Sequence, residues 1–308
     1  GPRKVVYDNG EGRLSIVAAR GGDGKPLANR APKRFNFASQ PVWDPEGKKI
    51  VYRTGKDDEG QAGIWVMDLS KGKPTAQALT NPGFDADTDD RRPAISPDGK
   101  VVAFVRGEKK RSDHDLCFVA IAGSAPPSCI PEPDQEVTRP TWAPDGKAIL
   151  VVASDTEDKQ YELLRYTSEQ PGSPDASDWQ DTGFETDELH SPEEGRHVVA
   201  VAWSPARDRR RVAFAADWTS PGDYGLFIGN ASEDGKLEAE PKRRGEVSIA
   251  CELSWSSNGK ELAVVSKAGC GSEGSATISL FAVDDPRPSL EPLAEGRNPS
   301  LQPDKPAP

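Results

Sequence analysis

One phrase recurs along this chain with small changes. Residues 91–105 read RRPAISPDGKVVAFV, and similar phrases begin at Ser39 (SQPVWDPEGKKIVYR) and Thr138 (TRPTWAPDGKAILVV). Looser copies begin at Val198 and Cys251, and residue 297 begins a sixth copy that stops after its first half. Repetition at a steady period indicates a repeated structural unit, so this feature constrains the fold more than any single motif.

Each copy predicts a β-hairpin. A short apolar strand ends in Pro-Asp-Gly-Lys or a variant, and a second apolar strand follows at once. In such a turn the proline fixes φ, the aspartate bonds to nearby backbone, and the glycine accepts a positive φ. A second hairpin follows, clearest where residues 63–69 and 76–80 flank the turn SKGKPT. One unit should therefore hold four antiparallel strands, named A to D.

The spacing of the units predicts the architecture. The A strands lie near residues 41, 93, 140, 202, 253 and 299. Four strands per unit at a period of about fifty residues predict an all-β, six-bladed β-propeller that forms one domain over residues 1–308. The last blade is expected to be composite, with strand A from residues 298–305 and strands B to D from residues 4–37. Its strand D is placed near residues 32–37. This closure removes an open sheet edge.

Composition excludes some functions. The 308 residues carry a formal net charge of -11, whereas nucleic-acid binding needs a positive surface. No apolar run approaches the roughly 18 residues of a membrane-spanning helix, so this segment is not expected to insert into a membrane. A membrane tether outside the segment is compatible with both observations.

The four cysteines fall into two local pairs. Cys117 and Cys129 are centred on the C–D turn of the second full unit, and Cys251 and Cys270 flank the first hairpin of the fifth. Each pair can face across a hairpin at disulfide distance. Two local disulfides favour an extracytoplasmic location: periplasmic, secreted or cell-surface. The alternative is four buried free thiols in a cytosolic propeller.

The repeats resemble those of the TolB-like propeller family, whose repeats are WD-like with a P-x-W-S-P-D-G core. The best matches are residues 41–47 (PVWDPEG) and 140–146 (PTWAPDG), and residues 93–99 replace the aromatic by Ile95. The resemblance covers nearly the whole chain. It implies a propeller of the kind found in periplasmic TolB, in ectodomains of bacterial receptors, and in gating domains of prolyl-oligopeptidase-like enzymes. TolB also has an N-terminal α/β domain, for which this chain has no room.

Catalytic and metal-binding motifs are weak. A serine hydrolase of the α/β type needs a G-x-S-x-G elbow, which the sequence lacks. His114, His190 and His197 lie in expected loops, where solvated side chains are the simplest interpretation. The carboxylates of residues 85–90 (DADTDD) alternate as in a calcium loop, but the EF-hand positions for Gly and a bidentate acid do not match. No catalytic residue, metal site or cofactor is predicted.

Three further features each have two interpretations: the equivalent tryptophans, a run of arginines, and Trp179. The equivalent tryptophans Trp43, Trp142, Trp203 and Trp255 are expected to pack between blades, and an aromatic ligand platform is the alternative. The arginines of residues 207–211 indicate a solvated loop tip or a contact for an anionic partner. Trp179, in the acidic insertion of residues 169–197, could anchor a partner or pack inside its own blade.

The predicted function is recognition without catalysis. The D–A loops should form one mouth of the central channel, where a protein, a peptide or a small ligand would bind. The predicted binding residues are Asp87, Asp89, Asp90, Arg92, Glu136 and Arg139. The protein would be the ectodomain of a membrane-anchored receptor or a periplasmic TolB-like binding protein. The alternative is the gating propeller of a prolyl-oligopeptidase-like serine hydrolase, whose catalytic domain would lie outside these residues.

Overall fold

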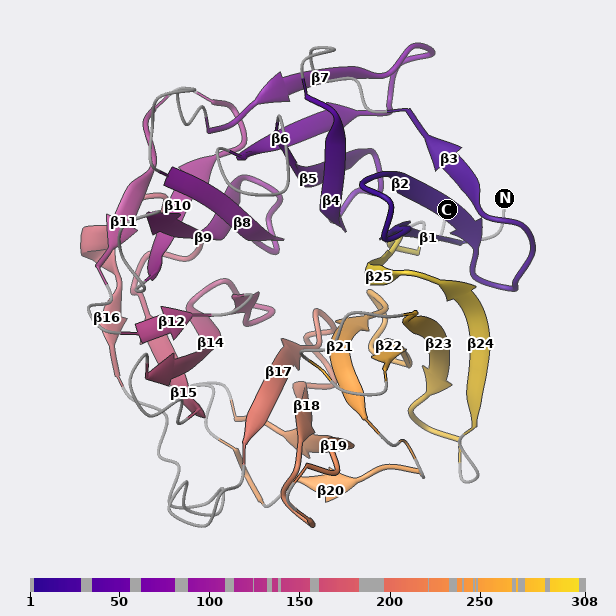
Figure 1. The fold of residues 1–308 in the computed structure, drawn as a ribbon. Coiled ribbons are helices and arrows are strands. Elements are labelled where there is room, and N and C mark those ends of the chain that lie inside the picture. Colours follow the sequence, from indigo (N-terminus) through magenta and orange to yellow (C-terminus); the bar gives the residue numbers. More distant parts are fainter. Residues whose placement is uncertain are drawn as a thin grey trace.

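Six antiparallel sheets form a closed ring around a central channel (Figure 1). This computed structural model describes residues 3–28, 35–55, 62–80, 88–108, 114–123, 125–131, 135–137, 140–155, 161–182, 197–220, 222–232, 237–239, 241–245, 247, 249–267, 270, 275–285 and 289–304. Each sheet is one blade, and its strands run outward from the channel in the order A to D. The predicted six-bladed propeller is confirmed.

Blades 1 to 3 follow one another along the first part of the chain. Blade 1 comprises β4 (Phe37–Trp43), β5 (Lys49–Gly55), β6 (Gly63–Asp68) and β7 (Thr75–Ala78). Blade 2 comprises β8 (Thr88–Ile95), β9 (Val101–Glu108), β10 (His114–Ala120) and β11 (Ser128–Ile130). Blade 3 comprises β12 (Gln135–Val137), β13 (Thr141–Trp142), β14 (Ala148–Asp155), β15 (Tyr161–Thr167) and β16 (Gln180–Asp181). Its strand A is therefore split between β12 and β13, which both pair with β14.

Blades 4 to 6 complete the ring. Blade 4 comprises β17 (Val198–Trp203), β18 (Arg211–Ala216), β19 (Gly225–Asn230) and β20 (Lys242–Arg243). Blade 5 comprises β21 (Ala250–Trp255), β22 (Glu261–Ser266), β23 (Thr277–Ala282) and β24 (Leu290–Glu295). Blade 6 comprises β25 (Arg297–Leu301), β1 (Lys4–Asp8), β2 (Leu14–Ala18) and β3 (Lys25–Leu27).

Blade 6 joins the two ends of the chain. β25 pairs antiparallel with β1, with Leu301 opposite Val5 and Ser300 opposite Val6. The composite blade is thus confirmed, but the predicted position of its strand D was wrong. Strand D is β3, which pairs with β2, whereas Phe37 already begins strand A of blade 1. The prediction failed because the short, exposed β3 has only three residues and no apolar alternation.

The repeated phrase forms the same turn in four blades. The N–H of Gly47, Gly99, Gly146 and Gly259 each donates to the carbonyl three residues earlier at 2.9 Å. These glycines have φ between 63° and 77°, a region that a side chain disfavours. The glycine of the phrase is therefore required by the backbone of the A–B turn.

Apolar packing lies between blades rather than within them. Each of six buried clusters combines residues of two neighbouring blades, and blade 6 packs against blade 1 in the same way as the others. The four equivalent tryptophans are only 5–6% exposed. The indole N–H of Trp142 donates to Ala94 O of the preceding blade at 3.1 Å, and Trp255 repeats this contact with Ala202 O at 2.9 Å. The tryptophans are packing residues, as predicted.

The arginine run also joins blades. Arg209 and Arg211 both pair with Asp284 on the C–D turn of blade 5, at 2.6 and 2.8 Å. Arg207 donates to Pro144 O of blade 3 at 3.2 Å. The expected solvated loop tip is thus wrong for Arg209 and Arg211, whereas Arg207 is exposed as expected. Together the three side chains connect blade 4 to both neighbours.

Trp179 packs in the core. It follows a 3-10 turn, η1 (Ala176–Asp178), and is 6% exposed. Its ring stacks on Phe118 of blade 2 and meets Trp142 edge-on. Trp179 is therefore a packing residue and not an exposed anchor, but it packs between blades 2 and 3 and not only inside its own blade.

Two disulfides are present. Cys117 and Cys129 lie directly opposite each other on β10 and β11. Cys251, in β21, bonds to Cys270, which lies beyond the end of β22. Both predicted pairings are confirmed. In the described part of the chain, no helix is long and apolar enough to cross a membrane.

Removing strand A of blade 6 should open the ring. A chain that ends at residue 297 loses the pairing of β1 and the buried side chain of Leu301. We expect its melting temperature to fall by at least about 10 °C, since a large domain loses roughly 2–4 °C per kcal/mol. Calorimetry would measure this, with a chain ending at Asp304 as the control because it keeps β25. Equal melting temperatures for the two truncated chains would contradict ring closure by β25.

Candidate functional site

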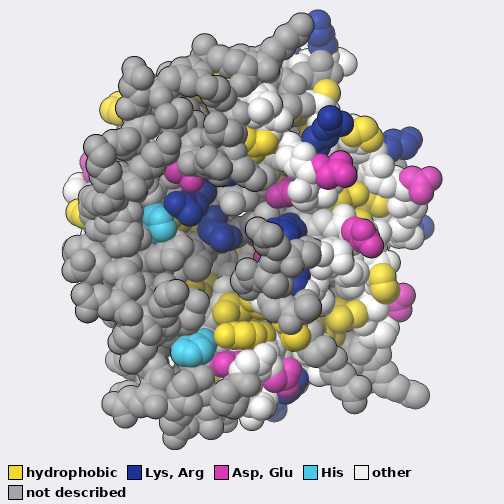
Figure 2. Space-filling view, viewed as in Figure 1, with side chains coloured by type: hydrophobic (Ala, Val, Ile, Leu, Met, Phe, Trp, Pro, Cys, Tyr) yellow, Lys and Arg dark blue, Asp and Glu magenta, His cyan; other side chains and the backbone are white. Residues whose placement is uncertain are grey.

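The channel has two different ends. Strand A of each blade runs along the channel from a D–A loop at one end to an A–B turn at the other. Figure 2 views the D–A end, where Lys, Arg and His side chains border the central hollow over β8 and β9. This D–A mouth is where the sequence places the binding residues.

Ion pairs fix the two acids of β8. Asp90 is fully buried and accepts from Arg106 of β9 through both oxygens, at 2.7 and 2.9 Å. Asp89 accepts from Arg53 of blade 1 at 2.9 Å and also pairs with Arg91 at 3.5 Å. Two-point pairing of a guanidinium with a carboxylate restricts both side chains. These contacts therefore hold the mouth in one geometry and join blade 1 to blade 2.

A β-bulge interrupts strand A just before the repeated proline. The register shifts in blades 1, 2, 4 and 5, and in the β25–β1 pair. Gln40, Arg92 and Asn298 occupy equivalent positions and have φ of 52°, 54° and 49°. A residue other than glycine is strained in this region by about 1–2 kcal/mol, and bulges redirect side chains next to functional sites. The bulges of blades 1, 2 and 6 thus place the polar residues Gln40, Arg92 and Asn298 at the mouth.

Hydrogen bonds connect successive bulges. The Arg92 N–H donates to the side-chain oxygen of Gln40 at 2.6 Å. The Asn298 N–H donates to the carboxylate of Glu252, which occupies the equivalent position in blade 5. Each bond satisfies a backbone group that the bulge removes from the sheet ladder. The strained positions are therefore stabilised by the neighbouring blade.

A second carboxylate lies beside Asn298. Asp8 is 8% exposed and accepts from the Gly10 N–H at 2.8 Å and from the Asn298 amide at 3.2 Å. Burial raises the pKa of Asp8 above its usual value of 3.8, opposed by these hydrogen bonds, and the nearby Glu252 raises it further. Burial also lowers the pKa of Lys267, and Arg297 lowers it further. Opposite charges thus meet at the boundary of blades 5 and 6.

Two histidines border the mouth. His114 begins β10, is 8% exposed, and its Nε2 lies 2.9 Å from Arg91. A guanidinium can only donate, so Nε2 is the acceptor in this contact. The His197 N–H donates to the buried carboxylate of Asp217. The expected solvated loop position is therefore wrong for His114, and His190 lies outside the described residues.

The structure brings together part of the predicted site. Asp89, Asp90 and Arg92 lie on one strand at the D–A mouth. Glu136 lies in β12, whose position in the ring puts it at the same end. Asp87 and Arg139 lie outside the described residues.

Other residues at the mouth escaped the sequence argument. Arg53 and Arg106 lie near the ends of the B strands of blades 1 and 2, and Gln40 and Glu252 occupy bulge positions. Arg53 and Arg106 could have been found from the sequence, because each is a charged residue that interrupts an apolar B strand. The alignment on the repeated proline would have found the other two.

The described acids of the D–A mouth do not form a metal-binding cluster. Among the described residues, no group of three or more His, Cys, Asp or Glu side chains could hold a metal ion. The carboxylates of Asp89 and Asp90 are already paired with arginines.

Comparison with known proteins supports the fold. Residues 68–181 match the family model described as the lipoprotein LpqB beta-propeller domain. A structure described as TolB from Agrobacterium tumefaciens superposes with a TM-score of 0.58, at 17% identity, over 96% of this chain and 90% of that chain. The chain has the TolB-like six-bladed propeller fold. No match is found among curated protein sequences.

Peptidase propellers also resemble this TolB-like ring. Prolyl oligopeptidase B from Galerina marginata gives a TM-score of 0.56 at 11% identity, over 94% of this chain and 39% of that chain. A puromycin-hydrolyzing peptidase from Mycobacterium tuberculosis gives 0.53 at 17% identity, over 92% and 43%. The chain thus spans less than half the length of either peptidase, and the likeness concerns the fold.

Removing the buried ion pair between Asp90 and Arg106 tests whether Asp90 stabilises the fold. Asp90→Ala leaves Arg106 without its buried carboxylate, so we expect a loss of about 2–4 kcal/mol, somewhat below the range for fully buried pairs because Arg106 is 22% exposed. Thermal or urea unfolding would measure the change. Glu46→Ala is the matched control, because its pair with Lys48 is exposed and should leave the melting temperature unchanged. An unchanged melting temperature for Asp90→Ala would contradict a stabilising role for this pair.

Proposed function

We propose that this chain is an extracytoplasmic recognition propeller that binds a protein or peptide partner at the D–A mouth. The observation that carries the proposal is the set of charged side chains held at that mouth by β8 and its neighbours. Asp87, Asp89, Asp90, Arg92, Glu136 and Arg139 remain the proposed binding residues. Within this set, Asp90 supports the others from the interior, and Arg92 is the proposed contact residue.

A preformed surface suits this role. Apolar clusters join every pair of neighbouring blades, so large rearrangements on binding would disrupt the core. Interfaces of pre-organised partners usually move little on binding. Charged groups at fixed positions then give specificity by matching an oppositely charged arrangement on the partner.

The proposed location rests on the disulfides and the family match. Two disulfides favour an oxidising compartment. The family model that matches residues 68–181 describes a lipoprotein, which supports a location outside the cytoplasm. A receptor ectodomain and a free periplasmic binding protein are both compatible with this location.

A second candidate is the gating propeller of a serine hydrolase. It is favoured by the similarity to prolyl oligopeptidase B and to the puromycin-hydrolyzing peptidase. In that case the native protein would continue into a domain with a G-x-S-x-G elbow. A fluorophosphonate probe would label the native full-length protein, whereas a recognition protein would stay unlabelled.

Photo-crosslinking in the native host tests the D–A mouth. A benzophenone amino acid at position 92 should give a defined adduct that is missing when the probe replaces exposed Gln180 on β16. With the captured partner purified, Arg92→Glu should weaken binding at least tenfold by reversing a charge. Arg92→Lys should retain most of the affinity. The same adducts from both positions, or equal affinity for Arg92→Glu and the unchanged chain, would contradict the proposal.

A further inference from the structure

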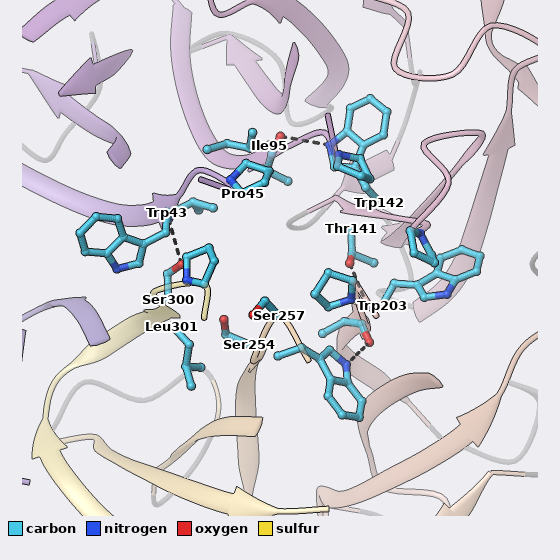
Figure 3. A pocket seen from close by; sticks show the side chains of 18 of the residues that line it. Trp43, Pro45, Ile95, Thr141, Trp142, Trp203, Ser254, Ser257, Ser300 and Leu301 are labelled. Carbon is cyan, nitrogen blue, oxygen red and sulfur yellow. Dashed lines mark hydrogen bonds between the residues drawn. The ribbon is translucent and has the colours of Figure 1, made fainter. Parts of the chain in front are cut away.

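The far end of the channel holds a cavity of about 360 Å³. Strand A and the A–B turn of every blade contribute to its wall (Figure 3). Its volume falls at the lower end of the range of about 300–1,000 Å³ that is usual for small-molecule sites. This A–B cavity lies at the opposite end of the A strands from the D–A mouth.

A proline collar surrounds the A–B cavity. The second residue after each aligned strand A position is proline in five blades and serine in the sixth. These collar residues are Pro45, Pro97, Pro144, Pro205, Ser257 and Pro303. Proline has no backbone N–H, so the collar presents methylene groups and carbonyl oxygens.

The wall carries almost no charge. Arg207 is the one charged residue among those that line the cavity in the described part of the chain, and it donates to Pro144 O at 3.2 Å. A cationic ligand would leave water there without a counter-ion, and an anionic one would find only the exposed guanidinium of Arg207, which Pro144 O already accepts from, so transfer of a charge is costly. The cavity therefore favours a neutral ligand.

Three backbone N–H groups in the wall of this cavity face away from strand B. The N–H of Ser96, Ala143 and Ser256 donates to strand B, at Val101, Ala148 and Glu261. Hydrogen-bonded positions alternate along an antiparallel pair, so the preceding residues Ile95, Trp142 and Trp255 direct their N–H and C=O away from strand B, toward the channel.

Two equivalent N–H groups already have acceptors. The Trp43 N–H donates to Ser300 Oγ at 3.0 Å, and the Trp203 N–H donates to Thr141 Oγ1 at 2.8 Å. Within the described residues, no protein acceptor receives the N–H of Ile95, Trp142 or Trp255. These three donors can serve a ligand oxygen.

The aromatic side chains do not form the binding surface. Figure 3 shows the rings of Trp43, Trp142 and Trp203 directed away from the opening, into the blades. Apolar contact would come from the proline rings and from small side chains such as Val42 and Ala94. Ser254 borders the same opening.

We propose that the A–B cavity binds a small, neutral, largely apolar molecule that carries a carbonyl oxygen. The proline collar would hold its apolar part, and the inward N–H groups would donate to the oxygen. This site is separate from the partner site at the D–A mouth and does not depend on it.

Fluorine NMR titration of the intact chain tests the proposal. The probes are 4-fluoroacetophenone, which is neutral with a carbonyl, and the charged analogues 4-fluorobenzoate and 4-fluorobenzylamine. We expect saturable binding of the ketone with a Kd on the order of 1 mM, as suits so small a ligand. Both charged analogues should bind at least tenfold more weakly. Absence of saturable ketone binding, or equal affinity for a charged analogue, would overturn the proposal.

Filling the cavity localises the site. Ser254→Phe should weaken ketone binding at least tenfold, whereas Gln180→Phe, the same change on an exposed outer strand, should leave the Kd unchanged. Val42→Phe fills the cavity from another blade and serves if Ser254→Phe does not fold. An unchanged Kd in a folded cavity-filling variant, or an equal loss in Gln180→Phe, would place the ketone elsewhere and refute the site.

Discussion

Pairing between β25 and β1 is the constraint on which the whole ring depends. A propeller blade buries its two faces against its two neighbours, so a ring that lacked one strand A would expose apolar surface on both sides. Side chains reinforce the pairing: the Asp304 N–H donates to Ser257 Oγ, and Arg3 pairs with Glu261 and Asp304. The two ends of the chain thus hold blade 6 against blade 5 and also against blade 1.

The closed ring also explains how strain is tolerated at the D–A mouth. The left-handed residues Arg92 and Asn298 each donate their N–H to a side chain of the preceding blade. Their geometry therefore depends on the distance between blades, which the buried clusters fix. A stiff ring can hold several such residues together, where an isolated hairpin could not.

The sequence predicted the parts of this structure that depend on local chemistry. The Pro-Asp-Gly turns and the equivalent tryptophans gave the blade number, the strand A positions and the composite blade. The cysteine pairs followed from the same hairpins. What failed was strand D of blade 6, because β3 is short and lacks an apolar pattern.

The candidate site was less predictable because it depends on contacts between blades. Asp89 and Asp90 were predicted as binding residues of a D–A loop, but their partners Arg53 and Arg106 are distant in the sequence or on the facing strand. His114 looked like a loop residue because its burial comes from packing at the start of β10. Local patterns carry no information on such pairings.

The two channel ends differ in chemistry along one set of strands. The A strands of blades 1, 2, 5 and 6 begin among charged or polar side chains, and the A strands end at a neutral collar that is mostly proline. The repeated proline phrase accounts for both ends of the channel. The bulge before the phrase lies at the D–A mouth, and the turn after it lies at the proline collar. A propeller of this kind can therefore present two separate recognition surfaces without a change in fold.

Hydrogen exchange with mass spectrometry tests the central claim, closure of the ring by the two ends of the chain, most directly. The amides of β25 and β1 should exchange as slowly as those of the inner strands β4 and β5, because all belong to one cooperative unit. Fast exchange of β25 and β1, with protection retained in β4 and β5, would show that the ends fray independently and would contradict the closed ring.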